Sequence, residues 1–216
     1  MSVFAVVGWL DVFTRNDYKD ILLQSLSYCQ KVKGIEIIAW CDMTNHVHLV
    51  FRSVKGQHPS LLLGDFKRFT SRAVVKAMQE NPRERRREFL LEQFKKAAAK
   101  SSNVKEYKFW RHDNKPIELW SNKVIWEKIN YVHNNPVEAG LIYRAQDYVY
   151  SSASDYSDEK GLMVLWYFSI MVEYGTWKTY LKLCKERDAI AHQRGDYRSC
   201  ELLSEIRSIH DFQNLK

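Results

Sequence analysis

The stretch IEIIAWCDMTNHVHLVF, residues 35–51, decides the fold of this chain. Apolar, β-branched and aromatic residues fill both of its halves, and Thr44-Asn45 between them is typical of a tight connection. The stretch therefore predicts a hairpin of two strands, residues 35–43 and 46–51. Side chains of a strand alternate between its two faces, so His46 and His48 project together while Val47 points into the other layer.

Further elements are predicted on both sides of this hairpin. Residues 4–13 are β-branched and aromatic and predict a strand, followed by a helix from about residue 16 to residue 32 that Gly34 ends. After the hairpin come basic helices, a short extended piece at 106–111, and a helix over about 122–134 that Pro136 ends. This order is the split β-α-β-β-α-β motif. We therefore predict an α+β fold with a ferredoxin-like antiparallel sheet and helices on one face.

The length and the charge pattern predict two parts of unequal size. A chain of 216 residues is long enough for one domain with an appendage. Beyond about residue 164 the pattern changes, because residues 166–216 hold eight Lys or Arg and seven acids and are nearly neutral. We expect a main domain at 1–164 and a helical C-terminal extension at 165–216, for which the sequence indicates no role.

The composition excludes several classes of protein. Hydrophobic residues make up 45% and aromatic residues 13% of the chain, which excludes a disordered protein. No apolar run approaches the ~18 residues of a membrane span, and the N-terminus lacks the pattern of a signal peptide. The four cysteines are widely spaced and form no CxxC pair, which favours reduced thiols over a zinc site. We expect a cytoplasmic protein that does not associate with a membrane.

The net charge of +7 is concentrated in one window. Residues 65–100 hold eleven Lys or Arg and five acids, so they carry +6 of that total. A three- and four-residue spacing of Leu62, Phe66, Phe69, Ala73 and Ala77 predicts a helix with these side chains on its apolar face. The basic side chains on the outer faces are Lys67, Arg68, Arg72 and Lys76. They form either an ordinary solvated helix face or a surface that contacts phosphates, and the excess of one sign favours the second reading.

Two elements carry residues suited to metal-assisted chemistry. His46 and His48 can reach one metal ion from one face of their strand, although two satisfied surface histidines show the same pattern. In the predicted helix 122–134, Tyr131 and Asn135 are four residues apart and therefore lie on one face. His133 lies roughly opposite and is expected to be structural or exposed. Tyr131 by itself is equally compatible with a core tyrosine.

These residues lie in motifs that resemble a known family. MTNHVHLV, residues 43–50, closely resembles the His-hydrophobic-His (HUH) motif of single-tyrosine transposases. YVHNNPVEAGLI, residues 131–142, resembles the tyrosine helix and the following turn of the REP-associated branch. FWRHDNKPI (109–117) and YVYSSA (148–153) look like that branch's linking segments, with Arg111 where glutamine is common. The resemblance covers about residues 3–164.

The resemblance implies a nuclease domain that cleaves and rejoins single-stranded or hairpin DNA. By their positions in the motifs, His46 and His48 match metal-binding histidines, Tyr131 matches the nucleophile, and Asn135 matches a third metal ligand. It also implies a divalent ion, Mg²⁺ or Mn²⁺, and a 5′-phosphotyrosine intermediate that needs no nucleotide cofactor, in agreement with the lack of a GxxxxGK[ST] loop. Such a bacterial protein is expected at the nucleoid, as a monomer or as a homodimer that exchanges the tyrosine.

The other residues have less definite roles at this level. Lys67, Arg68, Arg72 and Lys76 would follow the DNA backbone, and Trp110 or Trp120 would stack on unpaired bases. Two other functions remain open. One is a replication initiator or relaxase, although these generally carry the histidine motif after the tyrosine or add a helicase domain. The other is a domesticated DNA-binding protein with an idle site.

Overall fold

The computed structural model describes residues 1–54, 56–112, 116–157, 159–163 and 165. These residues belong to one compact unit, Met1–Trp166. The predicted helical extension lies, apart from Leu165, outside the described residues, so the division into 1–164 and 165–216 stays a prediction. Of the four cysteines, Cys29 and Cys41 are described, and both are buried free thiols.

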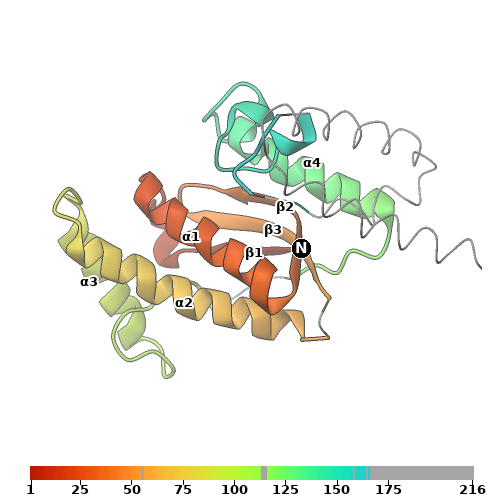
Figure 1. The fold of residues 1–216 in the computed structure, drawn as a ribbon. Helices are drawn as coiled ribbons and strands as arrows, with labels where there is room; N and C mark the ends of the chain where they lie inside the picture. The colour runs from red at the N-terminus through yellow and green to blue at the C-terminus, as the bar shows by residue number, and fades with distance from the viewer. Residues whose placement is uncertain (55, 113–115, 158, 164, 166–216) are drawn as a thin grey trace, which may run out of the picture. The chain divides into compact units, whose positions relative to one another are not determined.

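A three-stranded antiparallel sheet forms the centre of the unit (Figure 1). Its strands are β1 (Ser2–Ala5), β2 (Ile35–Asp42) and β3 (His46–Ser53), in the order β1-β3-β2. The predicted hairpin is confirmed, because β2 pairs with β3 from Ile35 opposite Ser53 to Asp42 opposite Val47. β3 therefore occupies the middle of the sheet, with a hydrogen-bonded neighbour on each side.

The first predicted strand is shorter than expected. β1 ends at Ala5 and is followed by a 3-10 turn, η1 (Val7–Trp9), in which Gly8 and Trp9 have φ values of 65° and 55°. The predicted extended piece at 106–111 is not a strand either. It runs beside the end of β1 through one isolated bridge, Val6 to Trp110, and a hydrogen bond from the Arg111 N–H to the Ala5 carbonyl. The left-handed turn at Gly8 and Trp9 bends the chain away from residues 106–111, so the pairing does not extend beyond this bridge.

Helices connect and cover the strands. The segments are α1 (Asn16–Tyr28), a π-helical turn η2 (Cys29–Lys33), α2 (Pro59–Glu80), α3 (Arg87–Ala99), α4 (Asn122–Glu138), η3 (Ala145–Asp147) and η4 (Asp155–Ser157). Gly34 ends η2, which continues α1, in the left-handed region at φ 75°. Pro136 does not end α4 as predicted: it lies inside the last turn, where its missing N–H removes one backbone hydrogen bond near the helix end. Gly140, at φ 69°, follows the helix end.

One face of the sheet is covered by α1 and α2. Phe4 of β1 is paired with Val47 of β3, so the two side chains share this face, and the Phe4 ring lies 5.7 Å from the Phe66 ring of α2. α1 and α2 also pack against each other. The face is an apolar core, in which Phe4, Phe66, Val47 and Leu49 are all buried.

The buried side of α2 differs from the predicted one. Phe69 was expected in the core, but its side chain is 60% exposed. Thr70 is buried instead, and its hydroxyl donates to the Phe66 carbonyl at 2.8 Å and accepts from the Trp110 indole N–H at 3.0 Å. Because both polar partners are present, a threonine can occupy a core position that the apolar pattern assigned to its neighbour.

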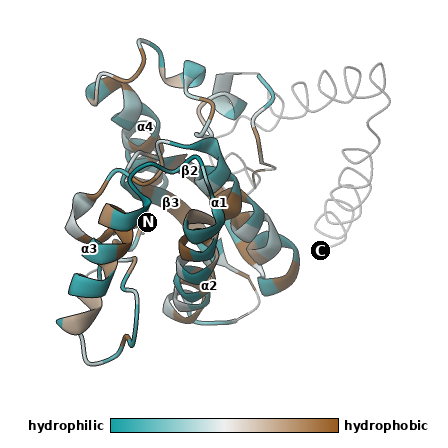
Figure 2. Cartoon of the chain, turned by 90° about the vertical axis from the view of Figure 1, so that its left-hand side faces the viewer, coloured by the Kyte–Doolittle hydropathy of each residue, from teal (hydrophilic) through white to brown (hydrophobic). Residues whose placement is uncertain are grey.

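The other face of the sheet carries His46 and His48 and is approached by α4. The ring of Tyr131, on α4, lies 5.5 Å from the ring of His48. Figure 2 shows the hydrophobic strands with α4 and α2 on opposite sides of them. The α+β fold with an antiparallel sheet is confirmed, with α1 and α2 on one face as predicted and α4 across the other. No helix in the described part of the chain has the length and apolar character needed to cross a bilayer.

Candidate active site

The central strand brings two imidazoles together. His46 and His48 occupy alternate positions of β3, and their Nε2 atoms lie 2.9 Å apart. Their rings meet edge to face, with centroids separated by 4.7 Å. His48 is buried, opposite Cys41 of β2, while His46 lies nearer the end of the strand and is half-buried. The two side chains therefore converge on one point from a rigid strand.

Asn45 determines which nitrogen of His46 faces its partner. The Asn45 amide nitrogen donates to the Trp9 carbonyl at 3.3 Å and to Asp11 Oδ1 at 3.0 Å. Both partners accept hydrogen bonds only, so the other end of the Asn45 amide is its oxygen, and it lies 2.7 Å from His46 Nδ1. An amide oxygen cannot donate, so Nδ1 carries the proton. In neutral His46 the lone pair is therefore on Nε2, which points at His48.

Burial keeps both imidazoles neutral near pH 7. Desolvation lowers the pKa of His48 to about 3, and the neighbouring His46 adds to this effect by repulsion. A hydrogen bond between His48 and the side chain of Asn135 acts in the opposite direction. Desolvation also lowers the pKa of His46, although the carboxylate of Asp11 opposes it. Neutral imidazole is the form that binds metal ions.

α4 presents the predicted phenol and carboxamide to these histidines. Tyr131 and Asn135 are one turn apart, and the Asn135 amide nitrogen donates to the Tyr131 carbonyl at 2.6 Å. The Tyr131 ring stands almost perpendicular to the His48 ring, and its side chain is 43% exposed. Lys128, one turn earlier, places its ammonium 5.6 Å from the centre of the Tyr131 ring. The tyrosine and the two histidines of the same chain thus meet at one partly open place.

His133 fastens α4 to the sheet. It is buried, and its Nε2 lies 2.8 Å from Ser152 Oγ. That hydroxyl also accepts from the Trp40 N–H at 2.9 Å and lies 3.2 Å from the Trp40 carbonyl, on β2. Burial lowers the pKa of His133 to about 4. The expectation that His133 is structural is confirmed, and its role is to hold the helix that carries Tyr131.

The residues at this point suit a divalent metal ion. Two imidazole nitrogens bound at right angles to one ion, each at about 2.1 Å, would lie about 3.0 Å apart. The separation of the Nε2 atoms is 2.9 Å. Among the described residues, no group of three or more His, Cys, Asp and Glu side chains could hold a metal. A third protein ligand would therefore be of another type, such as the Asn135 carboxamide oxygen, and the remaining positions would be open to water or substrate.

The predicted DNA-contacting residues of α2 do not gather at the histidines. Arg68 pairs with Asp65 at 3.0 Å and Lys76 with Glu80 at 3.9 Å, and both lie on the exposed side of α2, on the far side of the sheet from His46. Arg72 is exposed on the same helix. Lys67 differs from these three, because its ammonium donates to the Arg111 carbonyl at 2.7 Å, beside the end of β1.

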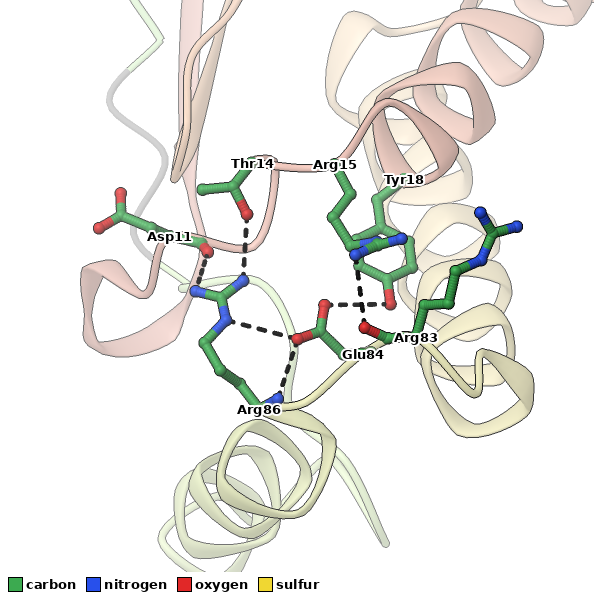
Figure 3. Close-up of polar contacts among 7 residues, drawn as sticks. All are labelled: Asp11, Thr14, Arg15, Tyr18, Arg83, Glu84 and Arg86. Carbon is green, nitrogen blue, oxygen red and sulfur yellow. Dashed lines mark hydrogen bonds and ion pairs between the residues drawn. The ribbon is translucent and has the colours of Figure 1, made fainter.

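Part of the basic window has a structural task (Figure 3). Arg86 donates to the Asp11 carbonyl at 2.9 Å and to the Thr14 hydroxyl at 3.1 Å. Its guanidinium also pairs with buried Glu84, which accepts from the Tyr18 hydroxyl at 3.4 Å. These bonds tie the loop between α2 and α3 to the segment between η1 and α1. The excess charge at 65–100 is therefore not a single free surface.

Of the two tryptophans predicted to stack on bases, only Trp120 is exposed. Trp110 is buried among Phe4, Phe13 and Phe109 and cannot stack on a base. Trp120 is 81% exposed. Trp9 was predicted to lie in a strand, but a left-handed turn places it beside His46. The hydrophobic periodicity of the sequence does not indicate this turn. Asn45 directly precedes His46. A metal-binding histidine usually forms a hydrogen bond through its other ring nitrogen, so Asn45 could have been predicted as that partner from the sequence.

Comparison with known proteins agrees with this geometry. A family model described as "Transposase IS200 like" matches residues 10–108, a range that includes both histidines and ends before α4. No curated protein matches the sequence. A solved structure of a REP-associated tyrosine transposase bound to a REP hairpin is similar over 73% of this chain and 78% of that one, at 14% identity and a TM-score of 0.52. At that identity the likeness shows the fold. Residues 10–108 are therefore similar to IS200-like transposases, and the described unit has the fold of a REP-associated tyrosine transposase.

Proposed function

We propose that this protein is a metal-dependent transposase that cleaves and rejoins single-stranded DNA through a covalent link to Tyr131. The observation that carries the proposal is the meeting of Tyr131, on α4, with His46 and His48, on β3, within one chain. The site would thus be complete in a monomer, although an exchange of the tyrosine in a homodimer is compatible with the same residues. Hairpin DNA at the border of a mobile or repeated element is the proposed substrate.

Each residue of the site would have a distinct role. The Tyr131 oxygen attacks the scissile phosphorus, a bond from phosphorus to tyrosine forms, and the bond from phosphorus to the 3′-oxygen breaks. The phenol proton leaves to water, and the upstream strand ends in a 3′-hydroxyl. Attack of a 3′-hydroxyl on the link reverses the step, so rejoining requires no ATP. Lys128, beside the Tyr131 ring, places a positive charge where the phosphate would bring a negative one.

His46, His48 and Asn135 would hold a divalent ion, Mg²⁺ or Mn²⁺. When bound, such an ion polarises the scissile phosphate and screens its charge. Asn45 holds the proton on His46 Nδ1 and so directs Nε2 to the ion. The hydrogen bonds of Ser152 to His133 and to Trp40 would hold α4, with Tyr131, beside β2.

A covalent adduct on a denaturing gel tests the proposal. The protein is incubated with Mn²⁺ and a hairpin oligonucleotide with single-stranded flanks, labelled at either its 3′ or its 5′ end. A 5′-phosphotyrosine link predicts that the 3′ label moves to the protein while the 5′ label stays on a shorter free strand. Addition of EDTA should abolish both changes.

Two tyrosine variants make this experiment decisive. Tyr131→Phe should form no adduct while it retains DNA binding. Tyr143→Phe, which changes a side chain 99% exposed beyond the end of α4, should behave like the wild type. An adduct that persists in Tyr131→Phe would refute the nucleophile assignment. DNA binding without any adduct in the wild type would instead favour a DNA-binding protein with an idle site.

A further inference from the structure

Trp9 is an exposed aromatic side chain at the histidine pair. Its ring meets the His46 ring edge to face, with centroids 5.6 Å apart, and its side chain is 50% exposed. A large apolar ring left open to water next to a catalytic centre is suited to contact a ligand rather than to fill a core. None of the roles described above uses this ring.

The backbone at Trp9 is held in a costly conformation. Its φ is 55°, in the left-handed region, and among the described residues no other non-glycine residue has a positive φ. This conformation is unfavourable for a residue with a side chain. The Trp9 carbonyl accepts a hydrogen bond from the Asn45 amide that also orients His46. The same amide thus positions the indole and the imidazole, and strain of this kind is typical of functional sites.

Positive charge accompanies the ring. The guanidinium carbon of Arg111 lies 5.3 Å from the centre of the Trp9 ring, within the range of a cation–π contact. Lys67 reaches the Arg111 carbonyl from α2. An aromatic platform bordered by cations is the combination that single-stranded nucleic acids recognise, since the base stacks and the backbone is attracted.

We propose that Trp9 stacks on an unpaired base adjacent to the cleaved phosphodiester. The inference rests on the proposed function, because it takes the histidine pair as the place of the scissile phosphate. Stacking at Trp9 would fix the strand relative to His46 and so select which phosphodiester faces Tyr131. An unpaired base exposes its flat surface and a base in a duplex does not, so the platform would favour single-stranded flanks over a paired stem.

The test measures binding without cleavage. In the Tyr131→Phe background, oligonucleotides carry 2-aminopurine at successive positions around the cleavage site, because the fluorescence of this base falls when it stacks. We expect one position adjacent to the cleaved bond to be quenched by the protein. Trp9→Leu should restore its fluorescence and weaken single-strand affinity about tenfold. Trp9→Phe, which keeps an aromatic ring, should retain most of the quenching and affinity.

Matched controls separate stacking from other effects. Phe89→Leu removes another exposed aromatic ring, on α3, and should leave the quenching and the affinity unchanged. Affinity for a fully paired duplex should not respond to Trp9→Leu. The thermal unfolding midpoints of Trp9→Leu and Trp9→Phe should agree, since both place a side chain with the same backbone strain at a half-exposed position.

The platform and the proposed function fail in different ways. If Trp9→Leu binds the labelled strand as tightly as its parent with unchanged fluorescence, the platform is refuted, whether or not Tyr131 forms an adduct. Equal losses of quenching and of affinity in Trp9→Leu and Trp9→Phe would also refute the platform. Such losses would result from the changed shape of the side chain and not from the loss of an aromatic ring. Absence of the adduct with intact Tyr131 would refute the proposed function alone.

Discussion

The two faces of the central sheet differ in what their side chains do. Toward α1 and α2, Phe4, Val47 and Phe66 form an apolar core. Toward α4, His46 and His48 meet Tyr131 across an interface that remains partly open. β3 contributes to both faces, because its side chains alternate. The two faces of β3 thus have different tasks. Substitutions on the core face should mainly lower stability, and substitutions on the histidine face should mainly change binding and reactivity.

Charge does not follow the same division. The excess of positive charge belongs largely to residues 65–100, which comprise most of α2, the loop after it, α3 and Lys100, and the candidate site belongs to the opposite face of the sheet. Arg68 and Lys76 have acidic neighbours on their own helix, and Arg86 is bound to the segment before α1. Net charge attracts a polyanion over a distance. It does not indicate where the polyanion reacts.

The largest expected effect is on the core face. Phe66→Ala should lower the free energy of unfolding by about 3–5 kcal/mol, because a fully buried ring is replaced by a cavity beside Phe4. Urea denaturation followed by circular dichroism measures this change. Phe69→Ala, on the exposed side of the same helix, should cost less than about 1 kcal/mol. Equal costs for the two variants would contradict the orientation of α2.

The buried imidazole of His133 should make stability depend on pH. The pKa of His133 is lowered from 6.5 to about 4 in the folded protein. Between these values the unfolded chain binds the proton and the folded chain does not, so the free energy of unfolding decreases as the pH falls from 6.5 to 4. The decrease due to this residue is up to about 3 kcal/mol. Urea titrations at several pH values measure it.

His133→Gln isolates this contribution. The pKa values of His46 and His48 are lowered as well, so the measured quantity is the difference in pH dependence between the metal-free wild type and the variant. The glutamine can keep a hydrogen bond to Ser152 but does not titrate in this range. His112→Gln, at an exposed position, should leave the pH dependence as it is. A wild-type slope in His133→Gln would show that the imidazole is not held neutral.

A smaller effect is expected where Asn45 supports the open face. Asn45→Ala removes the acceptor for His46 Nδ1, so the variant should lose the preference for that tautomer in ¹⁵N NMR spectra and bind Mn²⁺ about 10- to 100-fold more weakly. Isothermal titration calorimetry measures the affinity.

Thr44→Val is the control for Asn45. It removes another donor to Asp11, at 2.6 Å, without a direct contact to His46. The tautomer and the metal affinity should stay close to those of the wild type. A loss in Thr44→Val as large as in Asn45→Ala would mean that Asp11, rather than the Asn45 oxygen, governs His46.

The smallest effect concerns the charges on α2. If Arg72 and Lys76 contact DNA phosphates, their joint replacement by alanine should reduce the slope of log affinity against log salt by about 1.4, since each contact to a single strand contributes about 0.7. Fluorescence anisotropy at several salt concentrations measures the slope. Lys31→Ala, at an exposed position of η2, serves as the control. An unchanged slope in the double variant would restrict the phosphate contacts to the face of His46.

Local patterns predicted those elements whose geometry depends on neighbours in the chain. The alternation at 46–48 and the four-residue spacing of Tyr131 and Asn135 each follow from the repeat of one strand or one helix. Predictions failed where contacts from distant parts of the chain stabilise a residue in a position that its local pattern does not indicate. Thr70 is buried because Trp110 and the Phe66 carbonyl satisfy its hydroxyl. The predicted strand at 4–13 is cut short by a turn in which Trp9 has a positive φ, and tryptophan is not a residue typical of that conformation.

The sequence by itself determined the hairpin, the shared face of His46 and His48, and the shared helix face of Tyr131 and Asn135, because each depends on a periodicity within a single element. Only the tertiary structure decided that α4 crosses the histidine face while α2 covers the other, and that Trp9 lies against His46. These arrangements depend on packing between elements far apart in the chain. A local periodicity assigns a side chain to a face, but it does not specify what lies opposite that face.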